Sequence, residues 1–164
     1  MKRLVYCAAA VLLLAPALLY GEAAPLSFEG YGFSIAPLEP EEASPSPAEG
    51  TTQALIMLLP ASDGFAPNVN VQIQPFEGAL SDYAQLSRRQ FARGNIKILK
   101  EDVLPGEIRW SYRGMMRGQS LRWYARAVQH EGRVYLVTAT AAAGQWAQVG
   151  EQLKRCVNSF RLAR

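Results

Sequence analysis

Residues 133–141 read Arg-Val-Tyr-Leu-Val-Thr-Ala-Thr-Ala and form the strongest strand signal in the chain. β-Branched and aromatic side chains of this kind favour a pleated, half-buried surface. Three further strand-like segments precede it, and each junction carries a turn signal: Pro105-Gly106, Arg117-Gly118 and Glu131-Gly132. Short turns join neighbouring antiparallel strands. We therefore expect an antiparallel meander formed by residues 96–103, 108–115, 120–129 and 133–141.

Two helices and three earlier strands complete the predicted pattern. A helix is expected from Ser81, acting as the N-cap, to a stop at Gly94, with Asp82 near its positive end. Residues 145–159 predict an amphipathic helix, because apolar residues recur at spacings of three and four. The earlier strands are expected at residues 32–36, 54–59 and 69–74. The order β-β-β-α-β-β-β-β-α predicts an α+β fold: a single antiparallel sheet of about six or seven strands, flanked by two helices in an α/β/α sandwich.

The N-terminus has the three parts of a secretion signal. Lys2 and Arg3 precede an apolar run, and Gly21-Glu22-Ala23 places small residues at the −3 and −1 positions of a cleavage site after Ala23. The apolar run is shorter than the roughly 20 residues that span a bilayer. We expect residues 1–23 to be a cleaved signal peptide and residues 24–164 to form one domain, exported to the periplasm or the cell exterior. An uncleaved anchor is the alternative, and only then do we expect membrane contact.

The sequence lacks the usual residues of an enzyme. Loss of the signal removes Cys7 and leaves Cys156, so no intramolecular disulfide is expected. His130 is the only histidine, beside a predicted turn, and Cys156 falls by the apolar stripe of the last helix. No G-x-S-x-G turn, zinc pattern or phosphate-binding loop occurs. We expect no catalytic residue, no metal and no cofactor; a hydrolase is kept as an alternative.

Charge is divided between the two halves of the chain. Residues 24–80 hold seven acidic residues and no Lys or Arg, whereas residues 81–164 hold fifteen basic and six acidic residues. Several of the acids lie in the Pro-rich stretch 37–53, which predicts an exposed acidic loop. The division predicts either a basic binding face or an acidic loop that lies over a basic surface of the same molecule.

Four arginines alternate on two predicted neighbouring strands. Arg109 and Arg113 lie on one, and Arg122 and Arg126 lie on the other with Tyr124 between them. If these faces align, they could hold a carboxylate, a phosphate or an acidic partner surface. The alternative is that the side-chain stems pack under a helix while the charged heads pair with acidic residues. No nucleic acid is expected, because no recognition motif occurs and export argues against it.

Four segments carry a family resemblance. They are Gly-Tyr-Gly-Phe-Ser-Ile at 30–35, the helix start Ser81-Asp82-Tyr83, the end of the meander at 133–140, and Val-Asn-Ser-Phe-Arg-Leu at 157–162. The pattern resembles the PsbP/DcrB-like family of small exported α+β domains and covers most of residues 24–164. The resemblance implies an antiparallel α/β/α sandwich and a non-enzymatic accessory or assembly role beside larger complexes. It carries over no functional residue, because no functional motif is shared.

These observations predict an exported accessory protein that binds an unknown envelope protein or complex through the four arginines and Tyr124. The alternative function is a binding module for an anionic metabolite or lipid. Its pocket would lie between the sheet and a helix, lined by Trp110, Trp123 and Tyr124.

Overall fold

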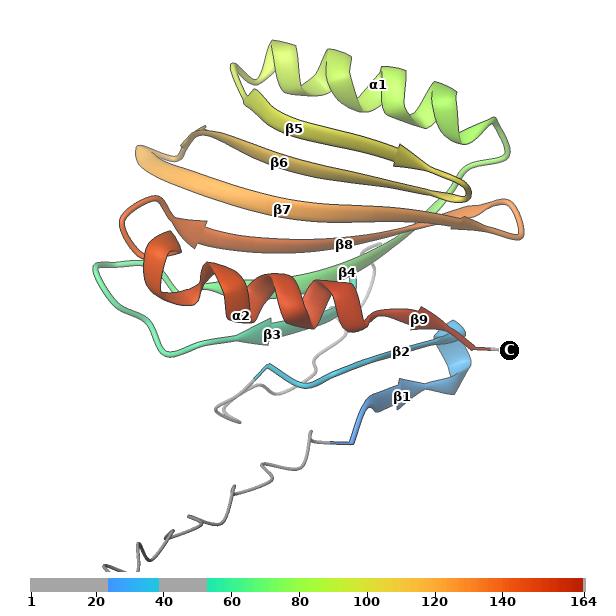
Figure 1. The fold of residues 1–164 in the computed structure, drawn as a ribbon, viewed down its shortest axis with the longest axis horizontal. Helices are drawn as coiled ribbons and strands as arrows, with labels where there is room; N and C mark the ends of the chain where they lie inside the picture. The colour runs from blue at the N-terminus through green and yellow to red at the C-terminus, as the bar shows by residue number, and fades with distance from the viewer. Residues whose placement is uncertain (1–23, 39–52, 164) are drawn as a thin grey trace, which may run out of the picture.

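The computed structural model of the protein describes residues 24–38 and 53–163. The predicted signal peptide, residues 1–23, and residues 39–52 of the predicted acidic loop lie outside the described residues. The elements, in chain order, are β1 (Leu26–Phe28), η1 (Glu29–Tyr31), β2 (Phe33–Ile35), β3 (Gln53–Leu58), β4 (Asn68–Pro75), α1 (Leu80–Arg93), β5 (Lys97–Leu104), β6 (Glu107–Met116), β7 (Gln119–His130), β8 (Arg133–Ala142), α2 (Trp146–Ser159) and β9 (Arg161–Leu162) (Figure 1).

The main sheet has six strands in the order β3-β4-β8-β7-β6-β5, and each neighbouring pair is antiparallel. Strands β5 to β8 are the predicted meander. Two of its turns have positive φ at both central residues: 51° and 80° at Arg117 and Gly118, and 46° and 69° at Glu131 and Gly132. Such turns match the right-handed twist of the strands that they join. The meander and its turns are confirmed.

The two helices cover opposite faces of the sheet. On β8, Leu136 packs in the hydrophobic cluster that includes Tyr83 of α1, whereas Val137 packs in the cluster that includes Leu153 of α2. Neighbouring strand residues point to opposite faces, so these two clusters lie on either side of the sheet. Helix α1 packs on β5 and β6, and α2 packs on β8, β7 and β4 (Figure 1). The α+β class and the sandwich of two helices around an antiparallel sheet are confirmed.

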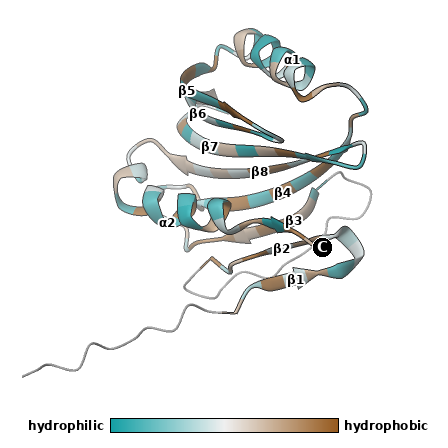
Figure 2. Ribbon diagram, turned by 45° about the vertical axis from the view of Figure 1, so that its right-hand side comes forward, coloured by the Kyte–Doolittle hydropathy of each residue, from teal (hydrophilic) through white to brown (hydrophobic). Residues whose placement is uncertain are grey.

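The sides of the helices that face away from the sheet are polar. Hydrophilic residues alternate with hydrophobic ones along α1 and α2 (Figure 2). In α2 the buried positions are Trp146, Gly150, Leu153, Cys156 and Val157, at the spacing of one helix face. Burying a side chain such as Leu153 or Val157 stabilises a fold by roughly 1.5–3 kcal/mol. None of the described helices is both long enough and apolar enough to cross a membrane.

A small second sheet lies beside the main one. Its order is β1-β2-β9, so the expected strand at 32–36 pairs with β1 and β9 and not with the main sheet. The ring of Phe33 stacks on Phe28 at 4.9 Å between centroids and lies 5.4 Å from Phe160. Because Phe160 directly follows α2, this aromatic contact brings β9 alongside β2. The amide of Ala163 also donates to the carbonyl of Gly32 at 2.8 Å.

Helix α1 begins earlier than the sequence predicts. The N-cap is Ala79, which makes no side-chain capping bond, and Ser81 lies inside the helix. The prediction of Ser81 as the cap is therefore wrong. Leu80 packs against the hydrophobic cluster between α1 and the sheet, and this contact favours a helix that starts one residue before Ser81. Asp82 lies in the first turn, as expected.

Candidate functional site

The five predicted binding residues lie on one face of the sheet. Arg109 pairs across the strands with Arg126, Arg113 pairs with Arg122, and Tyr124 pairs with Ser111 between them. Side chains at directly paired positions share a face. This is the face that α2 covers in part, and the half formed by β5 and β6 lies beyond the helix (Figure 1). The alignment that the arginine hypothesis required is therefore present.

The end of this face nearer the C-terminus of α2 is occupied by an internal ion pair. The Nη2 of Arg126 lies 2.5 Å from the Glu107 carboxylate, and the Nε of Arg109 contacts the other oxygen of that carboxylate. The Nη1 of Arg126 also donates to the carbonyls of Val157 and Asn158, both at 3.1 Å. Arg126 thus satisfies the C-terminal end of α2, where carbonyls lack helical partners and positive charge is favoured.

The Glu107 carboxyl is held in its charged form. Burial by itself raises its pKa, but the hydrogen bonds and charges of Arg126 and Arg109 outweigh burial and lower the pKa below its ordinary value. Only 13% of the Glu107 side chain and 8% of the Arg126 side chain are exposed. For Arg126 the structure therefore matches the alternative, in which the charged head pairs with an acid and the stem packs under a helix. Arg109 pairs with the same acid, but its side chain stays 37% exposed.

Tyr124 is also engaged within the molecule. Its hydroxyl donates to Oδ1 of Asn158 at 2.8 Å, so the ring spans the space between β7 and the end of α2. The ring packs against the α2-side core. Tyr124 thus marks the edge of the covered half of the face.

The other end of the face carries three cations in one row. Lys97, Arg113 and Arg122 stand opposite one another on β5, β6 and β7, and we call them the basic row. Lys97 and Arg113 are exposed, and the guanidinium of Arg122 lies over the Trp146 ring, 5.5 Å from its centroid. In the part of the chain that the structure describes, none of the three makes an ion pair. Because adjacent strands are about 4.8 Å apart, the three side chains start from neighbouring positions across the sheet, and no described acid pairs with any of them.

Lys97 is the member of this row that sequence reasoning missed. It lies inside the predicted strand 96–103, but its opposition to Arg113 depends on the strand register. A register shift between Ile98 and Lys100 separates this pair from the rest of the β5–β6 ladder, and a sequence pattern does not reveal such a bulge.

The described ion pairs do not connect the acidic and basic halves of the chain. Each one joins two residues that both lie within 81–164, such as Arg88 with Glu101 and Lys154 with Glu151. The predicted loop that would neutralise a basic surface falls largely on residues 39–52, outside the described residues. The basic row is thus uncompensated by the described acids of the first half.

The reactive side chains are placed as the sequence suggests. Cys156 is buried, its thiol donates to the Ala36 carbonyl at 3.3 Å, and burial raises its pKa to about 12. A thiol held protonated in this way is a poor nucleophile. His130 is exposed at the end of β7, 3.7 Å from the Glu131 carboxylate. Among residues 24–38 and 53–163, no three His, Cys, Asp or Glu side chains group as metal ligands would.

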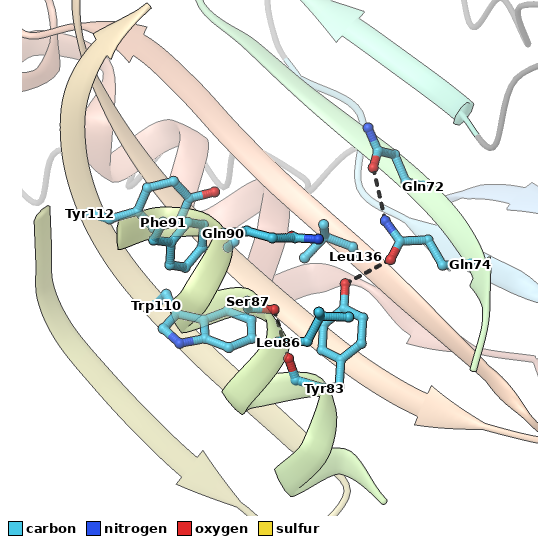
Figure 3. A pocket seen from close by; sticks show the side chains of 11 residues that line it. Gln72, Gln74, Tyr83, Leu86, Ser87, Gln90, Phe91, Trp110, Tyr112 and Leu136 are labelled. Carbon is cyan, nitrogen blue, oxygen red and sulfur yellow. Dashed lines mark hydrogen bonds between the residues drawn. The ribbon is translucent and has the colours of Figure 1, made fainter. Parts of the chain in front are cut away.

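A pocket lies between α1 and the sheet, on the face opposite the arginines. Its volume is about 230 Å³. The hydroxyl of Tyr83 donates to Gln74 at 2.9 Å, and Gln74 donates to Gln72 at 3.2 Å along one wall (Figure 3). The other walls are formed by apolar and aromatic residues, together with Ser87 and Gln90. None of the lining residues is charged.

The predicted pocket differs from this one in two of its three residues. Trp110 lines the cavity, as expected. Trp123 shares that face of the sheet but does not line the cavity, and Tyr124 points to the opposite face. Because strand neighbours alternate in direction, Trp123 and Tyr124 cannot both face one pocket. The uncharged lining also provides no cation for the anionic ligand that the sequence-based alternative named.

Comparisons with known proteins identify the fold. No protein-family model matches the sequence, and no curated protein is significantly similar to it. Among solved structures, the cyanobacterial PsbP (CyanoP) of Synechocystis sp. PCC 6803 matches with a TM-score of 0.65 and 13% identity, over 92% of this chain and 98% of that chain. The chain has the PsbP-like fold. A second structure with this fold, the protein of unknown function PA94 from Pseudomonas aeruginosa, matches with a TM-score of 0.59 and 14% identity, over 88% of this chain and 99% of that chain.

The PsbP-like fold confirms the resemblance that the sequence suggested, at the level of architecture. The binding role of the arginines and Tyr124 stays a prediction. Of the four arginines, Arg113 and Arg122 make no ion pair with a described residue and so remain candidates for this role. The structure adds Lys97 beside them.

Proposed function

We propose that this protein is a non-enzymatic accessory protein that acts outside the cytoplasm and binds an acidic component of the cell envelope through the basic row. The observation that supports the proposal is the row of three cations on an open half of the sheet, without an acidic partner among the described residues. A cluster of like charges destabilises an isolated protein, and a partner of opposite charge relieves this repulsion.

The placement of the reactive groups also supports a binding role. The Cys156 thiol is buried, and His130 is exposed at the end of β7 beside one carboxylate. Nucleophilic catalysis requires a nucleophile beside a base and next to a pocket that holds the substrate, and neither Cys156 nor His130 has this placement. The signal at residues 1–23 supports action outside the cytoplasm.

A charge-reversal variant tests the basic row. We expect Lys97→Glu/Arg113→Glu to lose the envelope partners that the immobilised wild-type protein captures from solubilised envelopes. Both side chains are exposed, so the variant should fold. The matched control is Arg89→Glu/Arg133→Glu, which changes the net charge equally at exposed positions on α1 and β8. Equal recovery of every partner by the two variants would contradict the proposal.

Export is tested separately. We expect the mature protein, recovered from cells that express the full chain, to begin at Ala24. Recovery of the folded chain from the cytosol with its first methionine would remove this part of the proposal.

A second candidate function rests on the pocket between α1 and the sheet. With amide, phenol and aromatic groups but no charge in its lining, it suits a small uncharged molecule with hydrogen-bonding groups. A thermal-shift screen of uncharged metabolites tests it, because a ligand that binds only the folded state raises the melting temperature. Substitution of Gln74 by Leu should abolish any such shift. A shift that survives this change would place the ligand elsewhere.

A further inference from the structure

The β6–β7 hairpin ends in an exposed apolar tip. Met115 and Met116 precede the Arg117-Gly118 turn and are 61% and 48% exposed. Consecutive strand residues point to opposite faces, so the tip shows a flexible, polarisable side chain on each side of the hairpin. The opposite arm places only Ser120 and Gln119 beside them. An apolar tip of this shape suits surroundings that enclose it on both faces.

Positive charge surrounds this tip. The basic row crosses the base of the hairpin, because Arg113 and Arg122 lie on its two arms and Lys97 is paired with Arg113. Arg117 stands in the turn itself, and Arg93 ends α1. The connection from α1 to β5 lies against the hairpin, since a side chain at Gly114 would meet Ile96 at 3.2 Å.

Little acidic charge accompanies these cations. Like the three cations of the basic row, Arg93 and Arg117 make no ion pair with any described residue. The β3–β4 turn touches the hairpin through a hydrogen bond from Gln119 to the Gly64 carbonyl at 3.2 Å. That turn contributes one acid, Asp63. This end of the molecule is therefore basic, and the tip of its β6–β7 hairpin is apolar.

The opposite end of the sheet provides a contrast. The β5–β6 hairpin also exposes two apolar residues, Val103 at 62% and Leu104 at 40%. They are flanked by Asp102 on one arm and Glu107 on the other. Exposed apolar residues therefore occur at both ends, but acids flank those of the β5–β6 hairpin on both arms, whereas cations flank the two methionines of the β6–β7 tip.

We propose that the β6–β7 tip docks on an anionic lipid bilayer, with the two methionines at the boundary of headgroups and acyl chains and the surrounding cations on lipid phosphates. This inference rests on the proposed function, since it takes the basic row as the anion-binding surface and names a bilayer as the acidic component. Bilayers combine the two features that the tip matches, negative surface charge and an apolar phase that encloses a protruding side chain. A flat acidic protein surface would match the charge but would provide no apolar phase around both faces of the hairpin.

Sedimentation with vesicles tests the inference. The full chain and its variants are mixed with vesicles of phosphatidylglycerol and phosphatidylcholine, and in parallel with immobilised polyglutamate, a polyanion without an apolar phase. All proteins carry the same N-terminal segment, so differences between them report the tip. The variants are Met115→Ser/Met116→Ser and Lys97→Glu/Arg113→Glu. The matched apolar control is Val103→Ser/Leu104→Ser.

We expect Met115→Ser/Met116→Ser to lower vesicle binding about tenfold and to leave polyglutamate binding intact, because only the bilayer has an apolar phase. The charge variant should lose both, with at least about a tenfold effect on vesicles, since each basic residue near an anionic surface contributes to binding. The control should bind both as the wild type does. On pure phosphatidylcholine the wild type and the variants should bind alike, because without anionic lipid the tip adds nothing to the N-terminal segment that all of them carry.

Each other outcome has a distinct meaning. Binding to polyglutamate without binding to vesicles would overturn the bilayer inference and leave the proposed function standing, with an acidic protein as the partner. Equal vesicle binding by the wild type and the methionine variant would also overturn the inference. Failure to bind either polyanion would overturn both proposals.

Discussion

Replacement of Arg126 by Met removes a charge on which both the sheet and a helix end depend. The side chain is 8% exposed, forms an ion pair with Glu107 at 2.5 Å, and donates to the Val157, Asn158 and Phe160 carbonyls at 3.1–3.4 Å. Met matches the length of the aliphatic stem but supplies no donor. The variant therefore leaves a nearly buried carboxylate with Arg109 as its remaining partner, and the end of α2 without its cation.

The expected loss of stability is about 3 kcal/mol. Removal of one partner from a buried ion pair costs roughly 3–5 kcal/mol, because the other charge stays buried. The lower end applies for two reasons. Arg109 still contacts Glu107, and the Nε of Arg126 is buried without a hydrogen bond to any described residue, so the native network is not fully satisfied.

Urea unfolding followed by circular dichroism measures this loss. We expect a lower midpoint for Arg126→Met with an unchanged denaturant slope. Arg113→Met is the control, because it removes an exposed arginine from the same face and should cost about 0.5 kcal/mol or less. Adding Glu107→Gln to Arg126→Met should restore part of the loss, as expected for coupled neighbours. A loss for Arg126→Met no larger than that for Arg113→Met would refute the reasoning.

Three further predictions concern acid stability, thiol reactivity and helix packing. The pKa of Glu107 is lowered in the folded protein, so this carboxylate stabilises the fold at pH values above the ordinary carboxyl pKa. That stability is lost as the pH falls through the folded-state pKa. Glu107→Gln should therefore flatten the acid limb of a stability–pH curve. The Cys156 thiol, with a pKa of about 12, should resist iodoacetamide at pH 8 and react once the protein is unfolded in urea; labelling of the native protein at the unfolded rate would contradict its burial. Gly150→Ala should lower the melting temperature, although alanine favours helices. The Cβ of the new alanine would lie 2.8 Å from Nε1 of Trp146, and the Trp146 ring is itself covered by Arg122. A higher melting temperature would show that the ring moves aside.

The meander could be predicted from sequence because its information is local. Alternation along residues 120–129 and 133–141 fixes the faces of two strands, and each Gly-containing turn fixes how neighbours pair. The small sheet could not be predicted in this way. Strand β9 has two residues, and its pairing with β2 depends on the aromatic contact of Phe33 with Phe160, residues far apart in sequence.

The candidate site could be predicted only in part for a similar reason. Alternation places Arg113 and Arg126 on the same face, but it does not tell which of them lies beneath the end of α2. The position of the helix decides this: it buries Arg126 against carbonyls and leaves Arg113 in solvent. Lys97 belongs to the site because the β5–β6 register places it opposite Arg113, and a single sequence does not reveal that register.

The pairing of β2 with β9 has a consequence for the order in which the molecule is assembled. Residues 33 and 34 meet residues 162 and 161, so the first described strands have no complete sheet until the last few residues of the chain are present. A chain still emerging from the ribosome can form the β5–β8 hairpins in sequence, but its leading segment must wait. During synthesis the two ends therefore meet only after the last strand is made, and a truncation of only a few C-terminal residues would remove the pairing partner of a segment more than one hundred positions away.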